Sequence, residues 1–128
     1  MAGKPYPKEA QLRRGARKYR RKVAAPRQWQ AITAAKAGPC VVCGEGFGIH
    51  RRGPLQWHHI VPRDLGGDDV PDNIAPAHET CHVLLTHRNQ TAGRLLCLHL
   101  TDAEYAYAVG RAGEGFAERI YGVEYERP

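Results

Sequence analysis

The 128-residue sequence has no long hydrophobic run, because none of its apolar stretches approaches the roughly 18 residues that cross a bilayer. Its first residues, MAGKPYPKEAQ, also lack the apolar core of a secretory signal. We therefore expect a cytoplasmic protein with no membrane partner. The length suits one domain with a modest core and is too short for two independent cores.

Cysteine is scarce, with four in the chain. Two disulfides would be a natural use of them in a secreted protein, but no export signal precedes them. In an intracellular chain, a Cys-x-x-Cys pair such as Cys40 and Cys43 is more often a metal clamp or a redox pair. We expect a metal site, since no thioredoxin-like strand and helix surround the pair.

Acidic residues are almost missing from residues 1–28, where Glu9 stands against ten Lys or Arg, a net charge of +9. The other hundred residues hold nine basic and twelve acidic residues, a net charge of −3. Basic residues that neutralise phosphates release condensed counterions, so this concentration suits a nucleic acid as the partner. Composition alone leaves a solubilising tail or a solvated helix face as the alternative. The residues expected to bind nucleic acid are Arg13, Arg14, Arg17, Lys18, Arg20, Arg21 and Lys22.

Local signals divide the chain into short elements. Residues 1–28 form a basic N-terminal arm that can be helical up to Pro26, with Gly15 weakening it, and we expect this helix to order on DNA. A short helix over residues 27–38 should end at Gly38 and Pro39.

Later in the chain, LQWHHIV at residues 55–61 has a strand-like composition, and residues 62–73 are typical of a loop. A helix that starts near Glu79 should close at Gly93. The C-terminal segment 101–121 opens with a capping box and has apolar residues at helical intervals, although its glycines predict a break.

The cysteine spacing predicts a structural zinc site. Cys40 and Cys43 can place two thiolates on one tetrahedral ion. His78 and Cys81 repeat the two-residue gap and would close a Cys3His site across almost forty residues. His78 is the weakest of the four ligand assignments, and Cys97 or His99 could take its place.

Three further motifs, taken in order, carry a family resemblance: His59 in WHHIVPR, Asn73 in VPDNIAP and His82 in ETCHVLL. With the two flanking knuckles, residues 40 to about 88 resemble the HNH (ββα-metal) endonucleases. Two positions depart from the usual pattern. His58 stands where aspartate is common, and His78 stands where the second knuckle usually has a cysteine.

The resemblance implies an α+β fold: a small ββα-metal core with a structural zinc knuckle, flanked by N-terminal and C-terminal helices. The nuclease domain would then span residues 29–128, with its motif core at 40–88. It also implies a metal-dependent endonuclease that hydrolyses DNA and leaves a 3′-hydroxyl and a 5′-phosphate.

 The implied substrate is double-stranded DNA.

The same resemblance assigns roles to single residues. His58 and His82 would bind one divalent ion, Mg²⁺ by preference, although imidazole ligands also suit Mn²⁺, Ni²⁺ or Zn²⁺. His59 would be the general base that takes a proton from water. Asn73 would either fix the glycine-rich loop or orient His59. The small size and the basic arm resemble a standalone phage or prophage member, whose partners would include packaging proteins.

Other readings of the motifs remain open. HETCH at residues 78–82 matches the His-Glu-x-x-His pattern of zinc metalloproteases, with Glu79 as the base, but it leaves the Cys-x-x-Cys pair and the basic arm unexplained. PCVVC matches part of a zinc deaminase signature, yet no histidine precedes residue 50. A catalytically silent zinc-knuckle module that binds nucleic acid is the main alternative.

Overall fold

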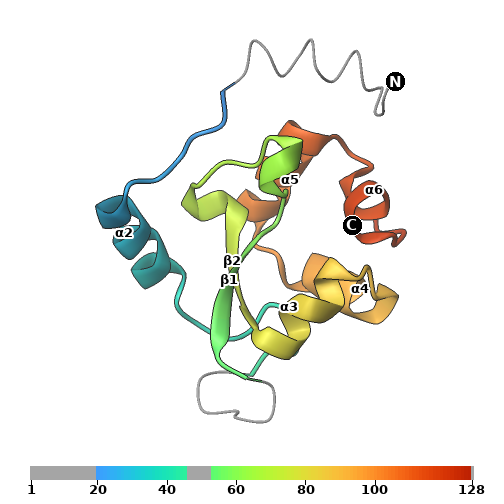
Figure 1. Ribbon diagram of the computed structural model, residues 1–128. Coiled ribbons are helices and arrows are strands. Elements are labelled where there is room, and N and C mark those ends of the chain that lie inside the picture. The colour runs from blue at the N-terminus through green and yellow to red at the C-terminus, as the bar shows by residue number, and fades with distance from the viewer. Residues whose placement is uncertain (1–19, 46–52, 128) are drawn as a thin grey trace.

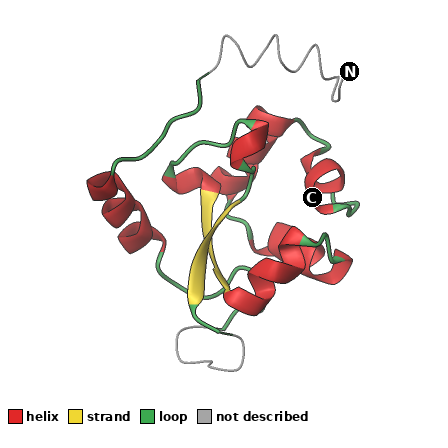
Figure 2. Cartoon of the chain, viewed as in Figure 1, coloured by secondary structure: helices red, strands yellow, loops and turns green. Residues whose placement is uncertain are grey.

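The computed structural model describes residues 20–45 and 53–127 of the chain. A two-stranded antiparallel hairpin stands at the centre, with helices around it (Figures 1 and 2). In chain order the elements are α2 (Pro26–Lys36), β1 (Leu55–His59), the 3-10 turns η2 (Arg63–Leu65) and η3 (Pro71–Asn73), β2 (Ile74–His78), α3 (Glu79–Thr86), α4 (Gln90–His99), α5 (Asp102–Ala112) and α6 (Phe116–Tyr121).

The hairpin places the histidine doublet at the end of β1, opposite the start of β2. Its register pairs His58 with Ala75 and His59 with Ile74, and it continues without a bulge to the end of β1. All five residues of β2 are buried, so this strand shows no alternation of polar and apolar side chains. Pro76 is tolerated because β2 has β1 on only one side, and its carbonyl accepts the Val41 N–H at 2.8 Å on the other.

The helices cover the hairpin on both sides. In Figure 1, α2 lies to one side of the strands, while α3 and α4 lie to the other. Together β1, β2 and α3 form the α+β core that the sequence predicts. Large buried side chains of the core include Ile60, Val61, Ile74, Leu85, Leu96, Phe116 and Tyr121. Burial of each contributes about 1.5–3 kcal/mol before conformational entropy is subtracted.

The prediction that the arm is helical up to Pro26 is wrong for residues 20–25, which have no helical structure. Lys22 and Ala24 instead donate their backbone N–H groups to the carboxylates of Asp68 and Asp69, at 2.6 and 2.9 Å. These bonds hold the backbone extended and replace the bonds of a helix. We call residues 20–25 the strap. The rest of the predicted arm helix lies outside the described residues.

Gly93 does not close a helix as predicted. The helix that starts at Glu79 ends at Thr86, and Arg88 then takes a left-handed conformation with φ of 58°. Asn89 caps a new helix, α4, by accepting the Ala92 N–H at 2.9 Å. Gly93 lies inside α4, where a Cβ would come within 3.1 Å of the Tyr121 Cβ, so glycine allows α6 to pack closely.

The C-terminal segment follows its sequence signals. Thr101 and Glu104 form the predicted capping box at the start of α5, and Gly113 ends that helix. Glu104 is buried and also forms a salt bridge with Lys36, which ties α5 to α2. Among the described residues, no helix is both long enough and apolar enough to span a bilayer.

The loop between the strands, residues 60–73, is closed tightly at Gly67. A Cβ at this position would lie 1.8 Å from the Val61 carbonyl oxygen and 2.9 Å from Asn73 Nδ2. Asn73 is fully buried and bonds to Val61 and to Asp68 across the loop. Only glycine therefore lets the two ends of the loop approach each other.

We predict that Gly67→Ala lowers the free energy of unfolding by about 3 kcal/mol or more, because the loop must open to admit the methyl group. Gly110→Ala is the matched control. Apart from its own helix backbone and chain neighbours, no described atom lies within 4 Å of a Cβ at Gly110, and this substitution should raise stability by about 0.5–1 kcal/mol. Urea unfolding of both variants measures the difference. Equal midpoints would contradict the assigned loop geometry.

Candidate functional site

A groove of about 1030 Å³ opens along β1 and is walled by side chains from α2, α3 and α6. Both histidines of the doublet line it, even though they point to opposite faces of the strand, because His59 is the last residue of β1. The groove residues used below are Trp29, Gln56, His58, His59, His82 and Tyr121.

His58 and His82 meet inside this groove. Their ring centroids lie 5.2 Å apart in an edge-to-face arrangement, with His58 on β1 and His82 on α3. Burial, together with the neighbouring His82 and His59, lowers the pKa of His58 to about 3. Burial also lowers the pKa of His82. Both imidazoles are therefore neutral near pH 7, the form that can bind a cation.

Hydrogen bonds orient both rings. His58 Nε2 lies 2.7 Å from the Tyr121 hydroxyl, and this hydroxyl donates to the Ile60 carbonyl at 2.6 Å. His82 Nδ1 lies 3.1 Å from Gln56 Oε1. Each imidazole thus uses one nitrogen within the protein and keeps the other for a ligand. The donor set fits a divalent ion with these two ligands and open positions beside them.

His59 is paired with a carboxylate. Its Nε2 lies 2.8 Å from Asp69 Oδ1, and Trp29 packs its ring edge against the imidazole at a centroid distance of 5.8 Å. Burial lowers the pKa of His59, while the hydrogen bond to Asp69 raises it, and the net shift is downward. Because Asp69 is an acceptor, Nε2 carries the proton and Nδ1 holds the free lone pair. A neutral imidazole held by a carboxylate can act as a base.

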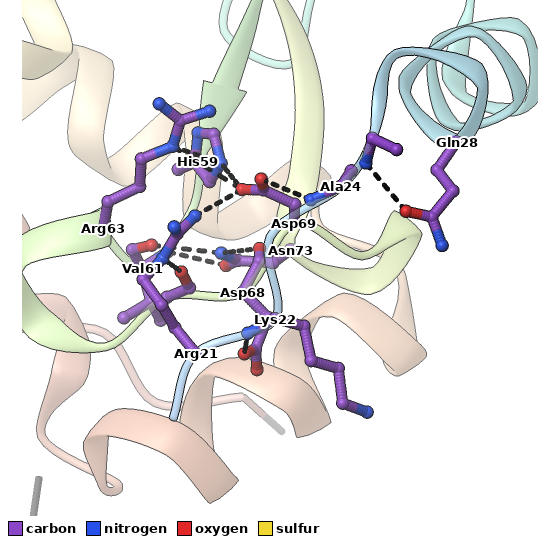
Figure 3. A network of polar contacts seen from close by, with 12 residues as sticks. Arg21, Lys22, Ala24, Gln28, His59, Val61, Arg63, Asp68, Asp69 and Asn73 are labelled. Atoms are coloured by element: carbon purple, nitrogen blue, oxygen red, sulfur yellow. Dashed lines mark hydrogen bonds and ion pairs between the residues drawn. The ribbon is translucent and has the colours of Figure 1, made fainter. Parts of the chain in front are cut away.

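Asp69 is the centre of a polar network that joins three segments (Figure 3). The Arg21 guanidinium donates to its Oδ1 at 2.5 Å, and the Ala24 N–H donates to its Oδ2 at 2.9 Å. Arg63 approaches the same Oδ1 at 3.5 Å. Burial raises the pKa of Asp69, but these bonds and charges, together with His59, lower it more, so the carboxyl is ionised.

Asn73 acts on this network through the loop. Its Oδ1 accepts the Val61 N–H at 2.8 Å, and its Nδ2 donates to the carbonyls of Val61 and Asp68, each at 3.0 Å. The side chain therefore fixes the loop that carries Asp69. Among the described residues, no hydrogen bond joins Asn73 to His59, so its influence on that ring passes through Asp69.

The second cluster gathers Cys40, Cys43, His78 and Cys81, whose ligand atoms all lie within 4.8 Å of one another. Three of the four residues are buried, and His78 Nδ1 lies 3.3 Å from Cys43 Sγ. Burial raises the pKa of Cys40, but N–H groups of the knuckle, including Val42, lower it more, to about 7. Three sulfurs and one imidazole at this spacing fit a structural zinc ion.

The alternatives to His78 do not reach this cluster. His99 Nδ1 donates to the Val41 carbonyl at 2.6 Å, and Cys97 is fully buried and does not belong to the group of ligand atoms. The two histidines of HETCH also separate, because His78 joins the cysteines while His82 faces His58. They do not converge as a His-Glu-x-x-His metal site requires.

Two residues that contact the groove histidines could not be found by sequence analysis. Asp69 lies in a run of turn-like residues, and Tyr121 lies about forty positions beyond the last histidine of the motif. Arg21, expected to bind nucleic acid, instead directs its charge at Asp69 and its Nε at the Gly67 carbonyl. The predicted contacts Arg13, Arg14, Arg17 and Lys18 lie outside the described residues, while Arg20 and Lys22 are exposed on the strap.

Comparison with known proteins agrees with this geometry. Residues 40–88 match the family model described as HNH endonuclease. This segment holds the Cys3His cluster and His58, His59 and His82, whereas Trp29, Tyr121 and the strap lie outside it. No curated protein and no solved structure matches the chain. The β1, β2 and α3 elements, with the Cys3His cluster beside them, form a ββα-metal core. Over residues 40–88, the chain is therefore similar to the HNH endonucleases.

Proposed function

We propose that this protein is a metal-dependent endonuclease that hydrolyses phosphodiester bonds of double-stranded DNA with His59 as the general base. The observation that carries the proposal is the hydrogen bond between His59 and Asp69, in a groove that also holds the His58 and His82 pair. A base and a pair of metal-binding imidazoles on one groove are the parts that such hydrolysis requires.

The tautomer of His59 determines which of its nitrogens can act as the general base. Asp69 holds Nε2–H, so Nδ1 accepts a proton from the attacking water, and the carboxylate stabilises the imidazolium that forms. The strap and Arg63 keep Asp69 ionised during this transfer. Hydrolysis in this manner would leave a 5′-phosphate and a 3′-hydroxyl, as the family resemblance implies.

His58 and His82 would hold the divalent ion, which when bound supplies Lewis-acid stabilisation of the negative charge that develops on the phosphate. Both ligands are nitrogen atoms of neutral imidazoles, so Mn²⁺, Ni²⁺ and Zn²⁺ suit the site as well as Mg²⁺. Cys40, Cys43, His78 and Cys81 would hold a separate structural zinc ion.

DNA would approach the groove along its basic side. The side chain of Arg63 is 55% exposed, and its guanidinium lies 5.9 Å from the centre of the Trp29 ring at the groove wall. Arg20 and Lys22 of the strap are exposed as well. The remaining basic residues of the arm would add contacts to the phosphate backbone. An intracellular location and a partnership with phage packaging proteins stay predictions.

We predict that the purified protein nicks or linearises plasmid DNA with Mg²⁺ or Mn²⁺, and that His59→Ala lowers the cleavage rate at least about 100-fold. His87→Ala is the matched control, because this exposed histidine lies at the end of α3 outside the groove. Zinc content and DNA affinity should stay unchanged in both variants. Initial rates of plasmid cleavage measure the effect.

Two other outcomes would decide against this proposal. If the parent binds DNA but never cuts it with any divalent ion, the protein is a silent zinc-knuckle module. If Glu79→Ala abolishes plasmid cleavage that His59→Ala leaves intact, the general base is Glu79 and the role proposed for His59 is wrong.

We predict one tightly bound zinc ion per chain, lost on Cys81→Ala together with much of the stability, since zinc binding and folding are coupled at such sites. Cys97→Ala is the control: it removes a buried thiol outside the cluster and should keep the zinc. Elemental analysis of dialysed protein measures the stoichiometry. Retention of zinc by Cys81→Ala would refute the assigned ligand set.

We predict that replacing Arg13, Arg14, Arg17 and Lys18 together with glutamine weakens DNA binding and reduces the slope of log K against log salt by about 2–4, because each phosphate contact contributes about 0.9. Arg21→Gln is the comparison, since this charge is directed at Asp69 and should change the slope little. Binding titrations at several salt concentrations test both. An unchanged slope in the fourfold variant would refute the role of the arm.

A further inference from the structure

Tyr121 places a buried hydroxyl against the candidate metal site. Its side chain is 1% exposed, and its oxygen lies between His58 Nε2 at 2.7 Å and the Ile60 carbonyl at 2.6 Å. The residue comes from α6, whereas His58 and Ile60 come from the hairpin and the loop that follows it. Neither the family match at residues 40–88 nor the sequence motifs include it.

The Tyr121 hydroxyl proton is donated to the Ile60 carbonyl. A carbonyl oxygen cannot donate, so the Tyr121 O–H donates to Ile60, and the tyrosine oxygen is then left to accept a hydrogen bond. His58 must supply that hydrogen from Nε2. The Ile60 carbonyl thus fixes the direction of the hydrogen bond between His58 and Tyr121, with His58 Nε2 as the donor. The lone pair of His58 is then on Nδ1.

We propose that Tyr121 is a positioning residue that holds His58 in the Nε2–H tautomer, so that Nδ1 is the nitrogen offered to the divalent ion. The inference rests on the proposed role of His58 as a metal ligand. Metal-binding histidines commonly donate their other N–H to a fixed acceptor, and loss of such an acceptor weakens metal binding. Here the acceptor is supplied by the C-terminal helix.

The surroundings of α6 hold Tyr121 in place. Gly93 of α4 allows the Tyr121 Cβ to approach closely, as described above. Arg88 donates to the carbonyls of Glu118 and Arg119 at the end of α6, at 3.3 and 3.0 Å. Gly122, with φ of 72°, then turns the chain away from the helix. The hydroxyl therefore has a fixed position relative to His58.

The first test is the tautomer itself, read from the ¹⁵N shifts and the couplings of His58 ring protons by NMR in protein that holds structural zinc but no second ion. The parent should show Nε2–H and an unprotonated Nδ1. Tyr121→Phe should convert His58 to a mixture of tautomers. A parent with Nδ1–H would overturn the proposal, and this result needs neither a folded variant nor any cleavage activity.

The second test is Mn²⁺ binding by titration calorimetry. Tyr121→Phe should weaken the affinity of the second site about 10–100-fold, while the tightly bound zinc stays at one per chain. Tyr105→Phe is the matched control, since it removes a phenolic hydroxyl from α5, where the ring packs against Phe116 rather than His58. Equal Mn²⁺ affinities in the two variants would overturn the proposal.

The two proposals fail separately. A parent that binds Mn²⁺ through His58 in the expected tautomer but does not cut DNA would refute the nuclease and leave the role of Tyr121 standing. A parent that cuts DNA while Tyr121→Phe keeps full Mn²⁺ affinity and a single His58 tautomer would refute the role of Tyr121 and leave the nuclease standing.

Discussion

The buried carboxylate of Asp69 is the constraint on which the groove depends. Taking an ionised carboxylate out of water is costly unless its oxygens are bonded, and here His59, Arg21 and the Ala24 N–H bond to them. These partners come from β1 and from the strap, and the carboxylate itself belongs to the loop that Asn73 and Gly67 close. The need to satisfy one charge therefore sets the positions of the base, the strap and the loop together.

The two candidate metal sites share the junction between β2 and α3. Cys81 and His82 are neighbours in the first turns of α3, where successive side chains are rotated by about 100°. Cys81 therefore faces the Cys3His cluster while His82 faces His58. A zinc ion at the cluster would fix the rotation of α3 about its axis and, through it, the direction of His82. The structural ion would thus set the geometry of the second site from a distance.

Local motifs predicted the parts of the site that are close in sequence or regular in spacing. The Cys-x-x-Cys pair, its partner pair and the capping box at Thr101 all depend on fixed intervals, and the structure brings each set together. Asp69 and Tyr121 could not be found this way, because their roles arise from tertiary contacts with His59 and His58. The predicted helix at residues 20–25 is wrong for the same reason. Hydrogen bonds to buried carboxylates on the loop outweigh the local helical preference of this segment.

The position of the strap affects how a polyanion would be held. Its backbone is bonded to Asp68 and Asp69, and Asp69 contacts His59, so a phosphate bound by the exposed Arg20 or Lys22 would be held close to the groove. Two weak attachments joined by a short connection act at a high effective concentration of one for the other. A long substrate would then stay bound for longer than either surface alone could hold it. Several reactions on one molecule before release would follow.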